Sequence, residues 1–157
     1  MTQIRLANPE DSANLAKLRY DFRSNTKNDN ESEPEFLARC NEWMSERLQQ
    51  TNWRCWVAQQ DSSIIGALWL QLIEKIPNPT SESELHAYIT NVFVSETARG
   101  QGLGSLLLDE ALRFCKRQLV HAVILWPSEK SRSLYQRHGF AVQSDLMELI
   151  LRSGDPL

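Results

Sequence analysis

The sequence predicts an α/β (α+β) fold, a single domain in which strands and amphipathic helices share one core. Three observations predict it: capped helix starts near the N-terminus, several short apolar runs of strand character, and a glycine-rich turn between a strand and a helix. The chain has 157 residues, of which 41% are hydrophobic and 24% charged, and this suits one domain with a sizeable core. Because the sequence contains no repeats, low-complexity tracts or linkers, we expect residues 1–157 to form one domain.

The N-terminal part predicts one strand followed by two helices. Residues 3–7 have strand character, and Asn8 can cap a helix that has proline at its first position. A polar loop at 24–32 follows, and Ser32 with Glu35 predicts a capping box for the second helix. Apolar side chains recur at helical spacing in both helices: Leu15, Leu18 and Phe22 in the first, and Phe36, Leu37, Cys40, Trp43, Met44 and Leu48 in the second.

The middle of the chain predicts a hairpin and a further strand. Residues 53–59 and 64–76 form two strands joined by a polar turn at 60–63. A loop at 77–87 leads from the hairpin to a strand at 88–94.

The most informative motif comes soon after that strand. It reads Arg99-Gly100-Gln101-Gly102-Leu103-Gly104 and directly precedes a predicted helix at 105–118. Glycine allows a ligand to approach the backbone closely, because it has no Cβ. The first turn of a helix has N–H groups without intrahelical partners, and the helix dipole adds positive potential there. We therefore expect residues 99–105 to form a phosphate cradle.

Two other phosphate-binding motifs do not fit this loop. The P-loop needs a lysine after its last glycine, but Ser105 follows Gly104 directly. The dinucleotide fingerprint needs glycine or alanine where Ser105 stands, and an acidic residue in the next strand, 120–126, which has none. We therefore expect neither a nucleoside triphosphatase nor a nicotinamide-dependent domain.

The C-terminal part predicts a strand, a short helix and a last strand. Residues 120–126 are almost continuously apolar, as expected for a strand covered on both faces, and a proline ends them. Ser128 can cap a short helix that Gly139 terminates, and residues 142–151 form the last predicted strand.

Composition and charge narrow the possible partners and the compartment. The net charge of −3 lacks the basic footprint of a nucleic-acid-binding protein, and no apolar stretch approaches the length of a membrane span. The three cysteines and three histidines have no disulfide or metal-ligand spacing, so we expect no metal. The N-terminus lacks the apolar core of a signal peptide, and with free thiols this favours a cytoplasmic protein.

Two segments resemble the GNAT superfamily of acyl-CoA-dependent N-acetyltransferases. The stretch from Val92 through the glycine motif resembles the acetyl-CoA motif of that family. Residues 128–140, Ser-Glu-Lys-Ser-Arg-Ser-Leu-Tyr-Gln-Arg-His-Gly-Phe, resemble its Asn-x-x-Ala-x-x-Leu-Tyr-x-x-x-Gly-Phe signature. The order of predicted elements matches the family over essentially the whole chain.

The resemblance implies a fold and a cosubstrate. The fold is a central mixed, mostly antiparallel sheet of six to seven strands, flanked by about four helices, with a splayed strand pair that holds the cofactor. The cosubstrate is acetyl-CoA (coenzyme A), whose pantetheine arm pairs with a strand backbone as an added strand does. The implied contacts are the backbone of Val92, Phe93 and Val94 for that arm, residues Arg99, Gly100, Gln101, Gly102, Leu103, Gly104 and Ser105 for the pyrophosphate, and Ser128 where the family has Asn.

The implied reaction moves an acetyl group from acetyl-CoA to a primary amine of a small molecule or peptide, by direct attack in a ternary complex. Tyr135 matches the family's general acid, which protonates the leaving thiolate. A backbone N–H of Val92 or Phe93 would stabilise the developing oxyanion. The general base stays open between His86, Glu84 and a water.

The acceptor site is expected between the 24–32 loop, the second helix and the 77–87 loop. The acids there either favour a cationic amine or are ordinary solvated carboxylates: Asp29, Glu31, Glu33, Glu35, Glu82 and Glu84. Trp43, Trp69 and Phe22 either line an apolar pocket or pack in the core. For the function, one alternative stays open: a non-catalytic acyl-CoA-binding or sensor domain of the same fold. The oligomeric state also stays open, and the resemblance makes a homodimer possible, since family members are often dimers.

Overall fold

The computed structural model describes residues 1–23, 31–81 and 84–152. The chain divides into two compact units, residues 1–126 and residues 127–157, here called the N-terminal unit and the C-terminal unit. Within the described ranges, none of the helices is both long enough and apolar enough to cross a membrane.

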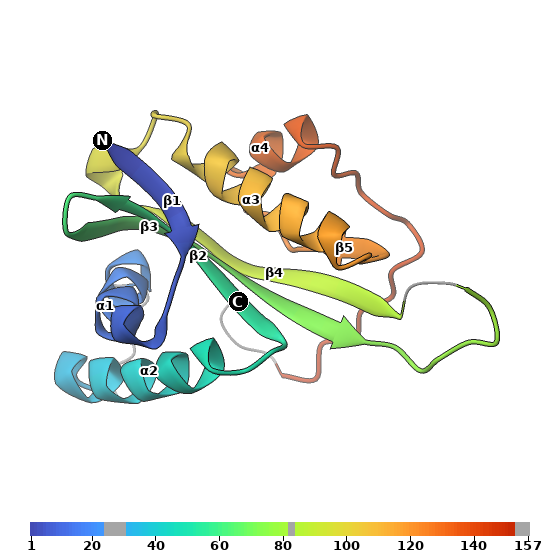
Figure 1. Ribbon diagram of the computed structural model, residues 1–157, viewed down its shortest axis with the longest axis horizontal. Helices are drawn as coiled ribbons and strands as arrows, with labels where there is room; N and C mark the ends of the chain where they lie inside the picture. The colour runs from blue at the N-terminus through green and yellow to red at the C-terminus, as the bar shows by residue number, and fades with distance from the viewer. Residues whose placement is uncertain (24–30, 82–83, 153–157) are drawn as a thin grey trace. The chain divides into compact units, whose positions relative to one another are not determined.

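A sheet forms the centre of the N-terminal unit. In the described part of the chain it has five strands in the order β1-β2-β3-β4-β5 (Figure 1). The first four strands pair antiparallel, and β5 runs parallel to β4. The predicted mixed, mostly antiparallel sheet is therefore confirmed, with five strands instead of six to seven. The strands are β1 (Thr2–Leu6), β2 (Trp53–Gln60), β3 (Ser63–Glu74), β4 (Leu85–Val94) and β5 (Ala122–Ile124).

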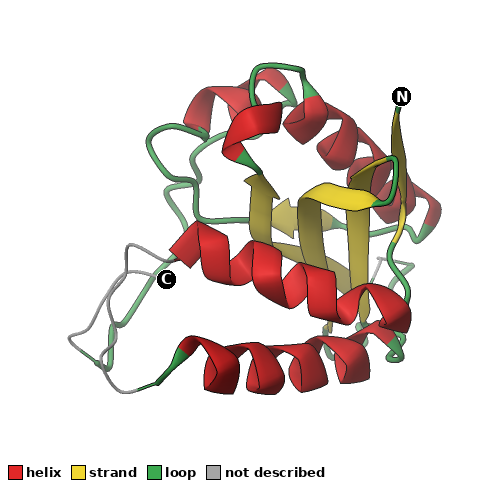
Figure 2. Ribbon diagram, turned by 90° about the vertical axis from the view of Figure 1, so that its left-hand side faces the viewer, coloured by secondary structure: helices red, strands yellow, loops and turns green. Residues whose placement is uncertain are grey.

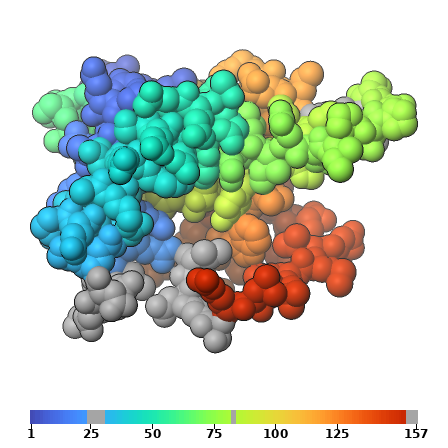
Figure 3. Space-filling model, turned by 90° about the horizontal axis from the view of Figure 1, so that it is seen from below, coloured from blue at the N-terminus to red at the C-terminus, as the bar shows by residue number. Residues whose placement is uncertain are grey.

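Helices cover both faces of this sheet. Two of them, α1 (Ser12–Arg23) and α2 (Glu33–Leu48), pack on one face, and α3 (Leu103–Arg117) packs on the other (Figures 1 and 2). Figure 3 views the unit from the side on which α2 lies, with the connection at 75–81 projecting at one edge. The two layers give the sheet two cores, one under α1 and α2 and one under α3.

The alternation of β2 separates these two cores. Cys55 and Val57 are buried with Leu15 of α1 and Met44 of α2. Trp56, on the opposite face, has its ring edge-on to Phe114 of α3, with centroids 5.4 Å apart. Successive side chains of a strand point to opposite faces, so one strand serves both cores.

Local capping sets the helix starts. Ser32 and Glu35 form the predicted capping box at the start of α2. Asn8 caps a short 3-10 turn, η1 (Pro9–Asp11), and α1 begins only at Ser12. The start is delayed because the Asp11 carboxylate accepts from the Asn8 backbone N–H at 2.9 Å and from both terminal nitrogens of Arg5 at 2.8 Å. These contacts hold the turn against β1.

Two predicted strands differ from the structure. The 120–126 segment forms only the three-residue β5 at the edge of the sheet, and Ile124 and Trp126 are exposed. The 142–151 segment has no strand assignment, and its apolar side chains are exposed. Apolar composition reports a preference for extended backbone, but a strand also needs a neighbouring edge to pair with.

The C-terminal unit contains a short helix, α4 (Arg132–Arg137). Ser128 and Ser131 form the turn that precedes it, with their hydroxyl oxygens 2.9 Å apart, and Ser128 also accepts from the Ser131 N–H. Gly139 follows the helix with a φ of 90°, the left-handed conformation typical of a helix C-terminus. The predicted helix and its glycine end are confirmed, but the cap position is Ser131 and the helix begins at Arg132, four residues after the proposed cap Ser128.

Candidate active site

A β-bulge shapes the middle of β4. Trp69 of β3 lies opposite Asn91, and the next residue, Leu70, lies opposite Ile89. Thr90 therefore has no residue opposite it. A bulge of this kind bends the strand and redirects side chains. As a result Thr90 and Asn91, which are consecutive, both line the same pocket.

Beyond Tyr88, the edge of β4 that faces away from β3 pairs with no strand among the described residues, and we call it the free edge of β4. Pairing with β5 runs from His86 to Tyr88 and ends there, whereas β4 continues to Val94. The Tyr88 ring is edge-on to that of Trp126, with centroids 5.2 Å apart, just past the end of β5. β5 is paired along its whole length, so β4 extends beyond it, and the splayed strand pair that the resemblance implies stays a prediction.

The glycine loop joins this free edge to α3. Gly100 and Gly102 have φ of 78° and 75°, so both use the left-handed region that L side chains rarely adopt. A Cβ added at either position would meet nothing within 4 Å, so the protein itself leaves the space beside them open. Gly102 is the N-cap of α3 and offers no side-chain cap, which leaves the first-turn N–H groups for a ligand or water.

Arg99 connects the loop to the strand. Its Nε donates to the Val94 carbonyl oxygen at 3.1 Å, and its guanidinium lies 5.9 Å from the centroid of the Phe93 ring. Phe93 is buried and packs on Phe22 at 4.7 Å, while Val92 and Val94 are half-buried. The Phe93 side chain therefore packs in the protein, those of Val92 and Val94 do so in part, and contact of a cosubstrate with their backbone stays a prediction.

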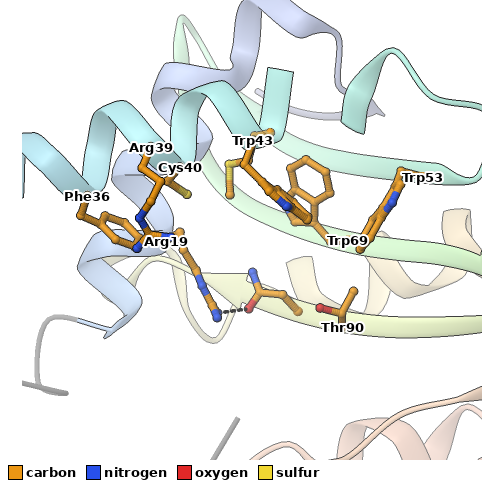
Figure 4. Close-up of a pocket in the computed structure, with 10 residues that line it drawn as sticks. Arg19, Phe36, Arg39, Cys40, Trp43, Trp53, Trp69 and Thr90 are labelled. Atoms are coloured by element: carbon orange, nitrogen blue, oxygen red, sulfur yellow. Dashed lines mark hydrogen bonds between the residues drawn. The ribbon is translucent and has the colours of Figure 1, made fainter. Parts of the chain in front are cut away.

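A pocket of about 280 Å³ lies between the two helices α1 and α2 and the sheet (Figure 4). Three indole rings form much of its wall, with centroids between 5.2 and 6.3 Å apart. The predicted Trp43 and Trp69 both line it, whereas Phe22 does not appear among its lining residues. The apolar lining is Phe36, Cys40, Trp43, Met44, Trp53 and Trp69, and the polar lining is Arg19, Arg39, Thr90 and Asn91.

The pocket is lined by two cations and, among the described residues, by no carboxylate. Arg39 forms a bidentate pair with Glu31, at 2.8 and 2.7 Å. Arg19 donates from Nη1 to Asn91 Oδ1 at 3.2 Å (Figure 4). Burial lowers the pKa of Arg19, and the nearby Arg23 lowers it further.

Of the two readings left open for the acids near the expected acceptor site, the described residues favour ordinary carboxylates with partners in the protein, and Glu84 accepts from the Asn78 N–H at 3.2 Å. Glu31 pairs with Arg39, and Glu33 pairs with Lys17 at 3.0 Å. Glu35 is committed to the capping box of α2. Asp29 and Glu82 lie outside the described residues. The described carboxylates at this end of the molecule thus have partners of their own.

The candidate bases lie at the start of β4, with His86 on the strand and Glu84 directly before it. Neither His86 nor Glu84 lines the pocket. The His86 ring stacks on that of His121 at 5.6 Å, and burial, then Lys75 and His121, lower the pKa of His86. Burial raises the pKa of Cys40, the pocket thiol, so this sulfur stays protonated and is a poor nucleophile.

The C-terminal unit carries the other two predicted site residues. Tyr135 is buried, with its ring edge-on to Phe140 at 5.7 Å. Burial raises the pKa of its hydroxyl, against an opposing hydrogen bond with Ser131. The phenol therefore remains a proton donor throughout the neutral range. Ser128 is exposed, and its hydroxyl is hydrogen-bonded to that of Ser131.

Sequence reasoning missed several pocket residues. Arg19 stands four positions after Leu15, on the apolar stripe of α1, and a charge on such a stripe is a signal that the sequence does offer. Alternation already places Thr90 on the same face as Tyr88, but Asn91 reaches that face only through the bulge, which no pattern in the sequence indicates. Within the described residues no group of three or more His, Cys, Asp or Glu side chains could hold a metal.

A family model matches most of the chain. The sequence model of the acetyltransferase (GNAT) family matches residues 16–140. Among curated proteins, "Putative phosphinothricin acetyltransferase YwnH" of Bacillus subtilis (strain 168) is 37% identical over 54 residues. That alignment covers 32% of this chain and 33% of the relative, so it spans about a third of the relative's length.

Solved structures share the fold over nearly the whole chain. A predicted acetyltransferase from Clostridium acetobutylicum, crystallised with acetyl-CoA, has a TM-score of 0.79 at 24% identity, covering 96% of this chain and 97% of its own. A ribosomal-protein-alanine N-acetyltransferase from Brucella melitensis biovar Abortus 2308 has a TM-score of 0.67 at 17% identity, covering 98% and 100%. At these identities the likeness concerns the fold.

Proposed function

We propose, on the premise that this chain belongs to the acetyltransferase (GNAT) family, that it transfers an acetyl group from acetyl-CoA to a primary amine of a small molecule or peptide. The observation that carries the proposal is the free edge of β4, which continues from the end of its pairing at Tyr88 to Val94 and leads to the glycine loop. A strand edge suits an extended amide chain, and uncapped helix N–H groups suit a pyrophosphate. Coenzyme A combines these two chemical parts.

Coenzyme A would be held mainly through backbone groups. The N–H and C=O groups of residues 92–94 would pair with the pantetheine amides, because the Phe93 side chain packs in the protein and those of Val92 and Val94 do so in part. The N–H groups of residues 100–105, with Arg99 beside them, would bind the pyrophosphate. Ser128 remains the proposed further contact in the C-terminal unit.

The chemistry proposed for these residues is direct transfer. The bound thioester supplies the acetyl group. The neutral amine forms a C–N bond with the acyl carbon as the C–S bond breaks. A backbone N–H of Val92 or Phe93 donates to the carbonyl oxygen while negative charge develops there. Tyr135 gives its proton to the departing sulfur and regains one from solvent, and the amine loses one proton to water.

Water is the proposed proton acceptor because the pocket offers no better one. None of the described residues that line it is a histidine or a carboxylate. Direct attack, with no acetylated enzyme, agrees with the protonated state of the Cys40 thiol. The same lack of a base is the observation that favours the second candidate, a non-catalytic acyl-CoA-binding or sensor domain of this fold.

Release of free coenzyme A from acetyl-CoA with a panel of primary amines separates the two candidates. We expect turnover by the unaltered protein, and a fall in kcat of about a hundred-fold or more in Tyr135→Phe, the usual scale for loss of a general acid. Tyr20→Phe is the matched control, because it removes a tyrosine hydroxyl that does not line the pocket. Binding of coenzyme A without turnover of any amine, and with no effect of Tyr135→Phe, would favour the non-catalytic candidate.

A further inference from the structure

Arg19 is a cation without a matching anion in a half-buried place. It lies on the face of α1 that turns toward the sheet, and its guanidinium ends beside Asn91 of β4 (Figure 4). Its other described contact is with the ring of Phe22, 5.8 Å away at the centroid. No ion pair in the described ranges involves Arg19, whereas the neighbouring Arg39 is neutralised by Glu31.

Partial burial without an ion pair is unfavourable for the positive charge of Arg19. An arginine stays protonated in proteins, so it cannot escape burial by losing its proton. Its five N–H donors are only partly used, because the amide oxygen of Asn91 takes one of them. A planar oxyanion on a bound ligand would supply the missing charge and accept two donors at once.

The position of Arg19 restricts where that oxyanion is carried. Asn91 directly follows Thr90, the bulged residue at the middle of β4. Under the proposed function, the reacting amine sits beside this part of β4, next to the backbone of 92–94. Since Arg19 reaches Asn91, which directly precedes 92–94, this placement favours an acceptor whose anion and amine are close together, as they are when both are attached to one carbon atom.

The rest of the pocket specifies the body of the acceptor. Its wall consists of three indole rings and Phe36, with Cys40 and Met44 beside them. Such a wall favours an apolar or aromatic group, and a volume of about 280 Å³ favours a small molecule over a folded protein. Each of these features lies within the N-terminal unit.

We infer that the acceptor is an α-amino acid with an apolar or aromatic side chain, whose carboxylate pairs with Arg19 and whose α-amine is acetylated. The inference rests on the proposed function and names its substrate class. It also replaces the cationic acceptor that an acidic rim would have favoured. In this reading the tryptophan cluster holds the side chain, and Arg19 makes the free carboxylate a requirement.

The test compares two acceptors that differ only in the anion. L-phenylalanine and L-phenylalaninol share the amine and the ring, but the alcohol has no carboxylate. Release of coenzyme A is measured for both at matched concentrations of neutral amine, with L-leucine and L-tryptophan as further acids. We expect kcat/KM for L-phenylalanine to exceed that for the alcohol at least ten-fold.

Variants of Arg19 test whether the preference for the carboxylic acid over the alcohol depends on this residue. Arg19→Gln is expected to lower kcat/KM for L-phenylalanine about ten- to hundred-fold, mainly by raising KM. A loss of this size corresponds to the free energy of a hydrogen bond between charged groups. The same change should leave the alcohol within about two-fold of the unaltered protein, while Arg19→Lys restores part of the loss. Arg23→Gln is the matched control, because Arg23 lies one turn further along α1 and does not line the pocket.

The outcomes separate this inference from the proposed function. Equal use of acid and alcohol by the unaltered protein, or an equal loss of both in Arg19→Gln, overturns the inference while acetyl transfer stands. If no acceptor is turned over, calorimetry of L-phenylalanine with the coenzyme-A-loaded protein decides. Binding that Arg19→Gln abolishes then supports the anion site and rejects the transferase, and no binding overturns the anion site as well.

Discussion

Replacing Gly102 by alanine tests whether the loop conformation serves a ligand. Gly102 has a φ of 75° and begins α3. An L residue in the left-handed region costs roughly 1–2 kcal/mol, and the stiffer unfolded chain returns about 0.4–1 kcal/mol. No clash adds to this, because a Cβ at Gly102 meets nothing within 4 Å. The net loss of stability is therefore about 1 kcal/mol.

The effect on coenzyme A binding should be larger than the effect on stability. Relaxing the backbone toward negative φ turns the N–H groups of the loop away from their common direction. Each hydrogen bond lost to a charged phosphate costs about 1.5–3 kcal/mol. We therefore expect the Kd for coenzyme A to rise about ten- to hundred-fold, while Tm falls by only about 2–4 °C.

Gly139→Ala is the matched control for backbone strain. Gly139 has a φ of 90°, a Cβ there also meets nothing within 4 Å, and the residue ends α4 in the other unit. Thermal unfolding and calorimetric titration with coenzyme A are measured for both variants. A Gly102→Ala protein with the expected loss of Tm but an unchanged Kd would refute the cradle. So would an equal weakening of binding in Gly139→Ala.

Three further predictions follow from the site and the core. None of the described pocket residues is a carboxylate or histidine, so kcat/KM should rise with pH and level off at the amine pKa of the acceptor. Two acceptors with different amine pKa values should reach their plateaus at different pH values. A plateau that begins at the same pH for both would indicate a base on the enzyme. Arg5 and the Asn8 N–H lower the pKa of Asp11, so its contribution to stability is full above its unfolded pKa and is lost as the pH falls through the folded pKa. Asp11→Asn should accordingly cost about 2 kcal/mol at pH 7 and flatten the acid limb of a stability-against-pH curve, and an unchanged acid limb would contradict this. Leu107 of α3 is fully buried against the sheet, so Leu107→Ala should cost about 2–5 kcal/mol in chemical denaturation, and a loss below 1 kcal/mol would contradict the packing of that core.

The segment expected to bind acetyl-CoA could be predicted from sequence because its residues lie close together in the chain. The residues from Val92 to Ser105 are continuous in the chain, and their roles depend on backbone conformation. Glycine at positions 100 and 102 reports that conformation directly, since both φ angles are positive in the structure. The helices and the antiparallel strands were likewise predictable, because capping residues and apolar periodicity act within a few positions.

The strands near the C-terminus could not be predicted for the opposite reason. Residues 120–126 and 142–151 have a suitable composition, yet β5 is three residues long and the later segment has no strand. Whether an extended segment joins a sheet depends on which edge is free and on which face is covered. Both are properties of the assembled fold, and neither is written in the alternation of the segment itself.

The pocket expected to bind the acceptor could be predicted only in part. Its pocket is assembled from two helices and three strands, so no continuous motif reports it. The single inserted residue at Thr90 exchanges the faces of the strand, and a period-two pattern then assigns every later side chain of β4 to the wrong side. Arg19 is different, because a charge four positions after Leu15 on an apolar stripe conflicts with core packing on sequence grounds alone. A charged residue in an apolar setting persists where the charge serves a function. In this pocket, which has no described carboxylate, that function would be to pair with an anionic acceptor.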